Sequence, residues 1–181
     1  MSTATVSLPT GTWTIDPTHT RIGFIARHMM VTKVRGSFSD FSADVEIADN
    51  PLDSKLSATV QMASIDTGNS DRDGHLRTND FFDIDQFPTM SLVATGFDRS
   101  GDGYVMHADL TIKGVTNAVD FELDLDGIGQ DPWGGTRAGF SATATVNRKD
   151  WGIEWNAPLE TGGVLVGEKV VIELDVQLIK G

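Results

Sequence analysis

Apolar and polar residues alternate with a period of two along almost the whole of this chain. Such alternation is typical of β-strands that bury one face. Turn residues such as Asp16-Pro17 and Asn50-Pro51 separate the alternating stretches, which are 13–15, 22–29, 38–47, 56–62, 90–97, 104–112, 119–125, 137–148 and 170–179. The pattern predicts about eight main strands in one antiparallel sheet that closes into a barrel, because an open sheet would expose aggregation-prone edges.

One segment, from Ser64 to Met90, breaks the alternation and concentrates Asp, Arg, His and Phe residues. Irregular segments on a regular scaffold often carry function. Ser70-Asp71 is a helix-start signal and Asp73 follows in the first turn, so a short helix is predicted from Asp71 to Leu76. A further helical turn over 79–82 would make a helical insertion near residues 70–83.

The interior of the barrel is predicted to be hollow. In the stretch 137–148 the even positions face inward, and in the stretch 22–29 Ile22, Phe24 and Ala26 share one face. Many inward residues are small: Ala26, Ala43, Ala58, Ala108, Ala138, Ala142 and Ala144. Because interiors are close-packed, small residues on several strands indicate space for a ligand. The alternative is that Phe24, Phe38 and Phe140 fill this space.

Polar groups at the ends of the inward faces are candidates to contact a ligand's head group. His28 follows Ala26, and Arg148 follows Val146. The alternative for both is a bond to local backbone or to a carboxylate at the rim. Trp151 and Trp155, before Ala157-Pro158, are interpreted as part of a mobile flap that resumes as a strand near Val164.

Evidence for catalysis is sparse. The histidines show no HxH or HxxxH metal spacing, and the sequence has no G-x-S-x-G elbow and no glycine-rich phosphate loop. We therefore expect no enzyme, no metal and no cofactor. The alternative is a small enzyme that acts on an amphipathic substrate through His19, His28 or His75.

The charge balance bears on partners. Fourteen Lys and Arg against 26 Asp and Glu give a formal net charge of −12, which argues against nucleic acid and anionic membranes. Cysteine is absent, and no stretch has the length of a membrane span. The N-terminus lacks the features of a signal peptide, so a cytoplasmic location is expected, or export if a leader has been removed.

Several sequence pieces, in order, carry a family resemblance. They are Trp13-Thr14-Ile15-Asp16-Pro17-Thr18-His19-Thr20 with Phe24 and His28, Gly36-Ser37-Phe38, Arg72-Asp73-Gly74-His75-Leu76-Arg77 with Asp80-Phe81-Phe82-Asp83 and Phe87-Pro88, Leu110-Thr111-Ile112-Lys113-Gly114-Val115-Thr116, and Arg148-Lys149-Asp150-Trp151-Gly152-Ile153. From about Gly11 to the C-terminus the chain resembles the YceI-like family of polyisoprenoid-binding proteins, although Trp151 stands where the family more often has Phe. The resemblance implies a lipocalin-like antiparallel barrel that holds a long isoprenoid, such as a polyprenyl phosphate, a polyprenol or a quinone tail.

We therefore predict a flexible N-terminus over 1–10 and a single lipid-binding barrel domain over 11–181. The expected partner is an isoprenoid-type lipid, held for carriage, storage or sequestration, and a homodimer is left open. His28 and Arg148 are the tentative head-group residues. The residues predicted to line the apolar tunnel are Ile22, Phe24, Ala26, Phe38, Phe41, Phe81, Phe82, Phe87, Met106, Phe140, Ala142 and Ala144.

Overall fold

The computed structural model describes residues 8–29, 31–156 and 166–180, and most of them belong to strands. The strands form one antiparallel sheet. In chain order they are β1 (Gly11–Ile15), β2 (Arg21–His28), β3 (Thr32–Phe38), β4 (Phe41–Ile47), β5 (Lys55–Gln61), β6 (Ile65–Asp66), β7 (Thr89–Ser100), β8 (Gly103–Ile112), β9 (Val115–Gln130), β10 (Thr136–Asn147) and β11 (Val166–Lys180). The helical pieces are η1 (Pro51–Asp53), η2 (Met62–Ser64), α1 (Ser70–Leu76) and η3 (Arg148–Trp151).

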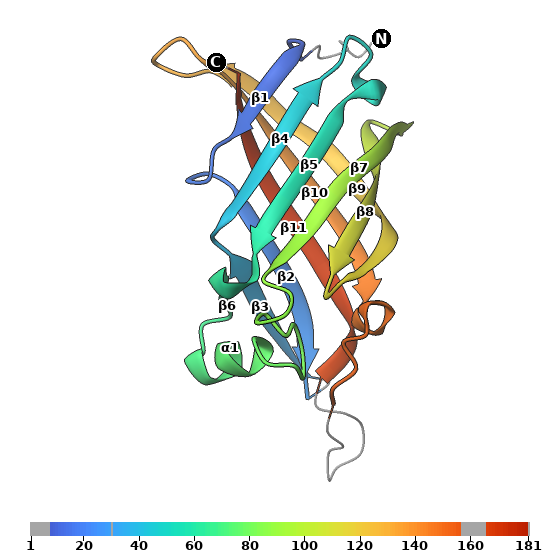
Figure 1. The fold of residues 1–181 in the computed structure, drawn as a ribbon. Helices are drawn as coiled ribbons and strands as arrows, with labels where there is room; N and C mark the ends of the chain where they lie inside the picture. Colours follow the sequence, from blue (N-terminus) through green and yellow to red (C-terminus); the bar gives the residue numbers. More distant parts are fainter. Residues whose placement is uncertain (1–7, 30, 157–165, 181) are drawn as a thin grey trace.

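The sheet closes into an eight-stranded antiparallel barrel (Figure 1), which confirms the predicted fold class. β11 closes the ring by pairing with β2 along one part of its length and with β1 near its end, where Thr14 faces Ile179. β1 and β2 therefore act as one bent strand. β3 and β4 likewise form one bent strand, and so do β5 and β6. The pairings show this: β3 lies between β2 and β6, and β4 lies between β1 and β5.

The strand Thr32–Phe38 is absent from the predicted strands. Phe38 ends β3 instead of beginning the next strand, and the chain bends at Ser39-Asp40 before β4. Sequence alternation is weak here because β3 carries Lys33, Arg35 and Gly36. Gly36 has a packing role: a Cβ at this position would lie 2.3 Å from Cζ of Phe24, so only glycine lets that ring lie against β3.

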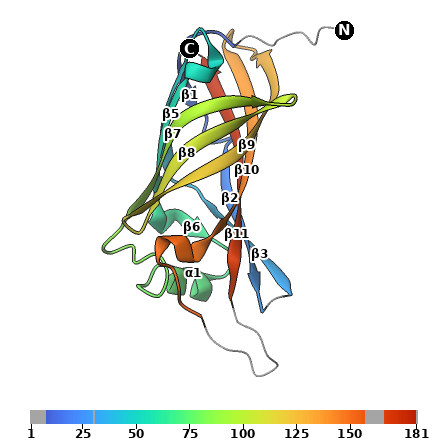
Figure 2. The same cartoon turned by 90° about the vertical axis from the view of Figure 1, so that its right-hand side faces the viewer.

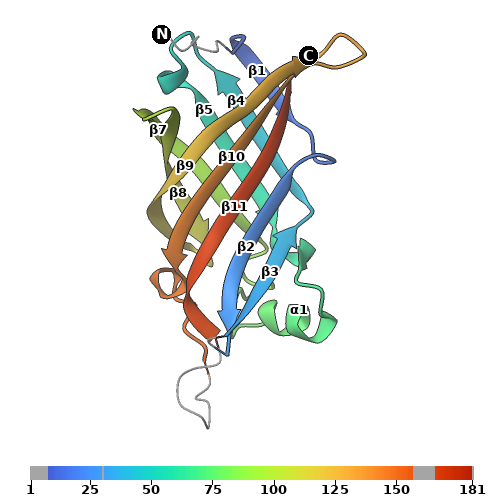
Figure 3. The ribbon, with the colours of Figure 1, turned by 180° about the vertical axis from the view of Figure 1, so that it is seen from behind.

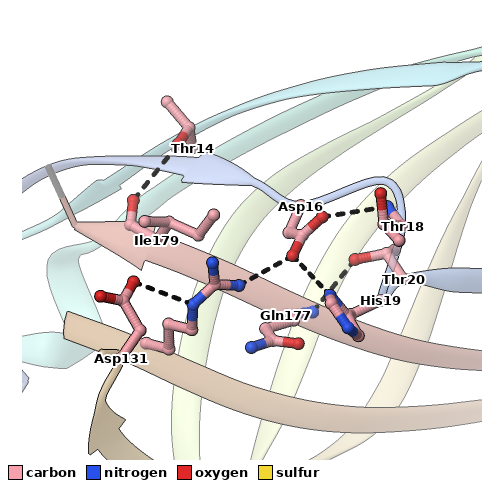
Figure 4. Close-up of polar contacts among 9 residues, drawn as sticks. Thr14, Asp16, Thr18, His19, Thr20, Asp131, Gln177 and Ile179 are labelled. Atoms are coloured by element: carbon pink, nitrogen blue, oxygen red, sulfur yellow. Dashed lines mark hydrogen bonds and ion pairs between the residues drawn. The ribbon is translucent and has the colours of Figure 1, made fainter. Parts of the chain in front are cut away.

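A polar network on the barrel wall holds the bend between β1 and β2 (Figure 4). The Asp16 carboxylate accepts hydrogen bonds from His19 Nδ1 at 2.7 Å, from an Arg137 guanidinium nitrogen at 2.8 Å and from the backbone nitrogen of Thr18 at 3.0 Å. The hydrogen bond from His19 is the largest influence that lowers the pKa of Asp16, to about 2. Arg137 also bonds Asp131, so the network ties the β1–β2 bend to β10.

The two ends of the barrel differ (Figures 1 and 3). α1 and η3 lie at one end, here called the α1 end, whereas η1 and the two ends of the described chain lie at the other, the η1 end. The predicted helix is confirmed as α1, and Asn69 caps it by accepting from the backbone nitrogen of Arg72. The predicted further helical turn is a series of turns.

Trp151 contradicts the flap interpretation. Its side chain is buried in η3, and its Nε1 donates to the carbonyl of Leu110 at 2.9 Å. The ring packs in a buried cluster with Phe121 and Ile153. Residues 157–165, where the rest of the predicted flap falls, lie outside the described residues.

Within the N-terminal stretch that was expected to be flexible, the Pro9 carbonyl accepts a hydrogen bond from Trp13 Nε1 at 2.9 Å. Residues 1–7 lie outside the described residues. No helix in the described part of the chain is long and apolar enough to cross a membrane.

Candidate ligand-binding cavity

An apolar cavity of about 290 Å³ runs inside the barrel. Its lining extends from Leu8 and Pro51 at the η1 end to Phe81 and Trp151 at the α1 end, and all the long strands contribute to it. The wall consists almost wholly of aliphatic and aromatic side chains. A cavity of this volume lies at the small end of the ~300–1,000 Å³ range of small-molecule pockets, so it suits a slender apolar chain.

Most of the predicted tunnel residues line this cavity. They are Ile22, Phe24, Ala26, Phe38, Phe81, Phe82, Met106, Phe140 and Ala142. Of the other predicted inward alanines, Ala43 and Ala58 also line it. The hollow interior and the alternative of a filled one therefore each hold in part. Small residues leave space on some strands, and phenylalanines narrow that space.

The remaining predicted residues lie elsewhere. Phe41 packs against a buried cluster that contains Phe38, Val60 and Met62. The Phe87 ring lies against the β8–β9 turn, where a Cβ on Gly114 would come within 2.9 Å of its Cε1.

Ala144 and His28 are also absent from the cavity wall. Ala144 is buried within the side-chain cluster at the α1 end, where neighbouring side chains cover it. His28 ends β2 opposite Thr32 and Val166, at the rim of the barrel.

Arg148 lines the cavity, but its guanidinium is already bonded to the protein. It donates to the carbonyls of Gly167 at 2.9 Å, Ile153 at 2.7 Å and Val166 at 3.3 Å. Burial lowers the pKa of Arg148, and the nearby Glu168 carboxylate opposes that shift. These bonds favour a structural role that fastens η3 to β11, so the assignment of Arg148 to a ligand's head group stays a prediction.

The histidines of the alternative hypothesis, in which the protein is an enzyme, lie on separate elements and have separate partners. His19 bonds Asp16 in the β1–β2 bend, and His75 Nε2 lies 2.8 Å from Asp80 Oδ2 in the insertion. No hydrogen bond or ion pair joins two histidines within residues 8–29, 31–156 and 166–180, and no three His, Asp or Glu side chains there form a metal-binding group.

The insertion closes the α1 end. Leu76, Phe81 and Phe82 reach the cavity wall from it. His75 packs edge-to-face on Phe81 and on Trp155, with ring centroids 5.0 and 4.7 Å apart. The segment that the sequence singled out therefore supplies one end of the apolar cavity.

The sequence interpretation missed the polar residues of the η1 end. Ser54, Lys55 and Tyr104 line the cavity there, close to Leu56 and Phe97. Leu56 begins the alternating series in β5 and could have been placed inward from that signal. Phe97 could not, because a bulge near Gly96 changes which residues of β7 face inward.

Comparison with known proteins agrees with this architecture. Residues 13–178 match the YceI-like domain. A UPF0312 protein of Staphylococcus aureus (strain MSSA476) is 39% identical over 163 residues, covering 89% of this chain and 93% of the relative.

Two solved structures show the same fold. BcnA of Burkholderia cenocepacia aligns with a TM-score of 0.78 and 20% identity over 90% of this chain and 98% of that chain. A polyisoprenoid binding domain from Saccharophagus degradans, implicated in plant cell wall breakdown, aligns with a TM-score of 0.66 and 15% identity over 92% of this chain and 97% of that one. With the family match spanning nearly the whole barrel, the chain belongs to the YceI-like domain family.

Proposed function

We propose that this protein binds a long isoprenoid or a similar amphipathic lipid inside the barrel, and that it carries, stores or sequesters that lipid without chemical change. The observation that carries the proposal is the apolar cavity that extends from one end of the barrel to the other. The polyisoprenoid binding domain from Saccharophagus degradans has the same fold and supports the choice of ligand class.

Energetics favour recognition of the tail. Burial of one CH₂ group contributes about 0.8 kcal/mol, so a five-carbon unit contributes roughly 3–4 kcal/mol before ordering costs. An exposed ion pair adds only ~0–1 kcal/mol. Affinity should therefore increase with tail length, while the head group sets orientation. A cytoplasmic location stays a prediction of the sequence, and a homodimer stays open.

The test has two parts. Native mass spectrometry of the purified protein should detect a bound lipid, and solvent extraction should identify its tail. A series of prenyl alcohols with two, three and four isoprene units should then bind the delipidated protein with rising affinity. Equal affinity along the series, or no saturable binding, would contradict the proposal.

A further inference from the structure

The barrel wall is incomplete between β5 and β7 near the η1 end. β5 and β7 are paired between the Gln61–Thr89 pair and the Ser57–Val93 pair. Toward the η1 end, no pairing of these two strands follows Ser57–Val93 among the described residues. Beyond that point Lys55 pairs with β4, and β7 continues along β8. Figure 2 shows β7 turning away from β5 as it rises toward the η1 end.

A β-bulge in β7 accompanies this divergence. The register of β7 with β8 shifts between Ala94 and Gly96. Bulges bend a strand and increase its twist, which moves the strand away from its neighbour. A Cβ added at Gly96 would meet no atom within 4 Å, so open space lies beside the bulge.

A surface groove of about 1050 Å³ covers the gap. Its walls come from β4, η1, β5 and β7. The groove and the barrel cavity share the lining residues Val45, Ser54, Lys55, Leu56 and Phe97. These shared side chains are therefore what lies between the apolar cavity and the solvent-filled groove.

We propose that the β5–β7 gap is the portal through which an isoprenoid passes into and out of the barrel, with its tail in the cavity and its head group in the groove. This inference rests on the proposed function. The two volumes agree with it, because the cavity suits a slender tail and the groove has room for a wider polar group. Leu56 and Phe97 are the apolar side chains that must move for the tail to pass.

The rim of the groove favours uncharged head groups over phosphates. Acidic side chains line it from several elements: Asp44, Glu46, Asp53 and Asp98. Two basic side chains line the described part of the rim. Lys55 lies across from Glu46 in the β4–β5 register, and His107 Nε2 lies 2.6 Å from Asp98 Oδ2. Like charges repel a phosphate, so an isoprenoid alcohol or quinone should enter faster than a diphosphate.

Gly96→Trp tests the portal, because Gly96 lines the groove and a Cβ added there meets no atom within 4 Å, so the new side chain can extend into the groove. Gly127→Trp is a matched control, since Gly127 on β9 also has no atom within 4 Å of an added Cβ and lies away from the gap. The probe is geranylgeranyl anthranilate, a fluorescent uncharged isoprenoid. In stopped-flow mixing, Gly96→Trp should lower both the association and the dissociation rate constants about tenfold, whereas Gly127→Trp should leave both near the wild-type values.

A post-folding block covers the case in which Gly96→Trp does not fold. The chain has no cysteine, so Thr95→Cys introduces a single thiol beside the groove, and Thr143→Cys introduces one on the outer face of β10. A bulky disulfide-linked label at Thr95→Cys should slow ligand exchange, and its removal by a reductant should restore the rate. The label at Thr143→Cys should have no effect.

The outcomes separate the two proposals. Unchanged exchange rates in blocked protein that still binds the probe would overturn the portal and leave the proposed function standing. Absence of saturable binding in the unmodified protein would overturn the proposed function itself. Glu46→Gln with Asp53→Asn should speed the uptake of geranylgeranyl diphosphate several-fold, whereas Glu122→Gln on β9 should not. Uptake of the diphosphate at the wild-type rate in the double variant would contradict selection by charge.

Discussion

Ala142 and Ala144 are neighbouring inward alanines on β10, and both are almost fully buried. Both pack in the buried cluster that includes Trp151, but only Ala142 also lines the apolar cavity. The strand pattern treats the two positions alike, because alternation reports only which face a residue occupies. Whether an inward side chain meets open cavity or other side chains depends on the residues of the opposite barrel wall.

This difference predicts that the same substitution has different main effects at the two positions. Ala142→Phe should fill cavity space and weaken isoprenoid binding by at least about tenfold while the fold is retained. Ala144→Phe should overpack the cluster and lower the free energy of unfolding by about 1–3 kcal/mol. Urea unfolding and binding of a fluorescent isoprenoid, measured on both variants, check the expectation. Unchanged binding in a folded Ala142→Phe protein would show that the cavity does not hold the ligand.

Asp16 gives the protein a pH-dependent contribution to stability. Its pKa is about 2 in the folded protein, mainly through the hydrogen bond from His19, whereas an unfolded aspartate titrates near ~3.9. The folded state therefore holds the carboxylate more strongly. The contribution is complete above about pH 4 and is lost as the pH falls toward about 2.

Asp16→Asn should accordingly lower the free energy of unfolding by about 1–2 kcal/mol at pH 6, allowing for the solvent exposure of His19. The difference from the wild-type protein should disappear near pH 2. Urea unfolding at several pH values provides the measurement, with Asp44→Asn at an exposed position as the control. A difference that persists at pH 2 would mean that Asp16 acts through packing and not through its charge.

At the scale of elements, α1 is held to the barrel by a small set of polar contacts. The buried Asp73 carboxylate accepts from the backbone nitrogen and hydroxyl of Thr67, and Arg72 donates to the same residue. His75 instead joins Asp80 and the rings of Phe81 and Trp155. Arg72 and Asp73 therefore fix the start of the helix, whereas His75 belongs to the contacts that close the α1 end.

His75→Ala should lower the melting temperature by roughly 2–4 °C, which corresponds to a loss of about 1 kcal/mol in a chain of this size. Ligand affinity should change little, because His75 is absent from the cavity wall. Differential scanning calorimetry and ligand titration test both statements, and Asp71→Ala at an exposed position of the same helix should shift the melting temperature less. Lost binding at unchanged stability would place His75 at the ligand.

The predictability of the elements follows their sequence patterns. Long strands such as β8 and β10 alternate cleanly and were placed from sequence. β3 was missed because charged residues and Gly36 obscure its pattern, although that glycine receives the Phe24 ring. The inward position of Phe97 was missed because a bulge shifts the strand by one residue, and the position of a bulge depends on the partner strand.

The candidate site was predictable to a similar degree. Residues whose environment depends on one strand, such as Phe24 and Ala142, line the cavity, and their contact with a ligand stays a prediction. His28 and Arg148 were predicted to face inward because they continue an inward face to the end of a strand. At a strand end, contacts with the local backbone decide where such side chains lie. The gap between β5 and β7 is a property of two strands together, and neither sequence shows it alone.

The whole molecule is an acidic barrel around an apolar cavity, and its formal net charge is −12. Such a surface repels an anionic ligand as it approaches, and salt weakens that repulsion. The Debye length falls from about 30 Å at 0.01 M salt to about 8 Å at 0.15 M, and the effect on an uncharged ligand is small.

Raising NaCl from about 0.01 to 0.15 M should therefore increase the association rate constant of geranylgeranyl diphosphate several-fold, because screening weakens the repulsion from the acidic surface. The rate for geranylgeraniol, which has the same tail, should change much less and serves as the control. Stopped-flow competition against a fluorescent isoprenoid measures both ligands. A diphosphate rate that falls with added salt would mean that local cations attract the head group, and would direct attention back to His28 and Arg148. A rate that rises would agree with a head group that approaches past the acidic rim of the groove.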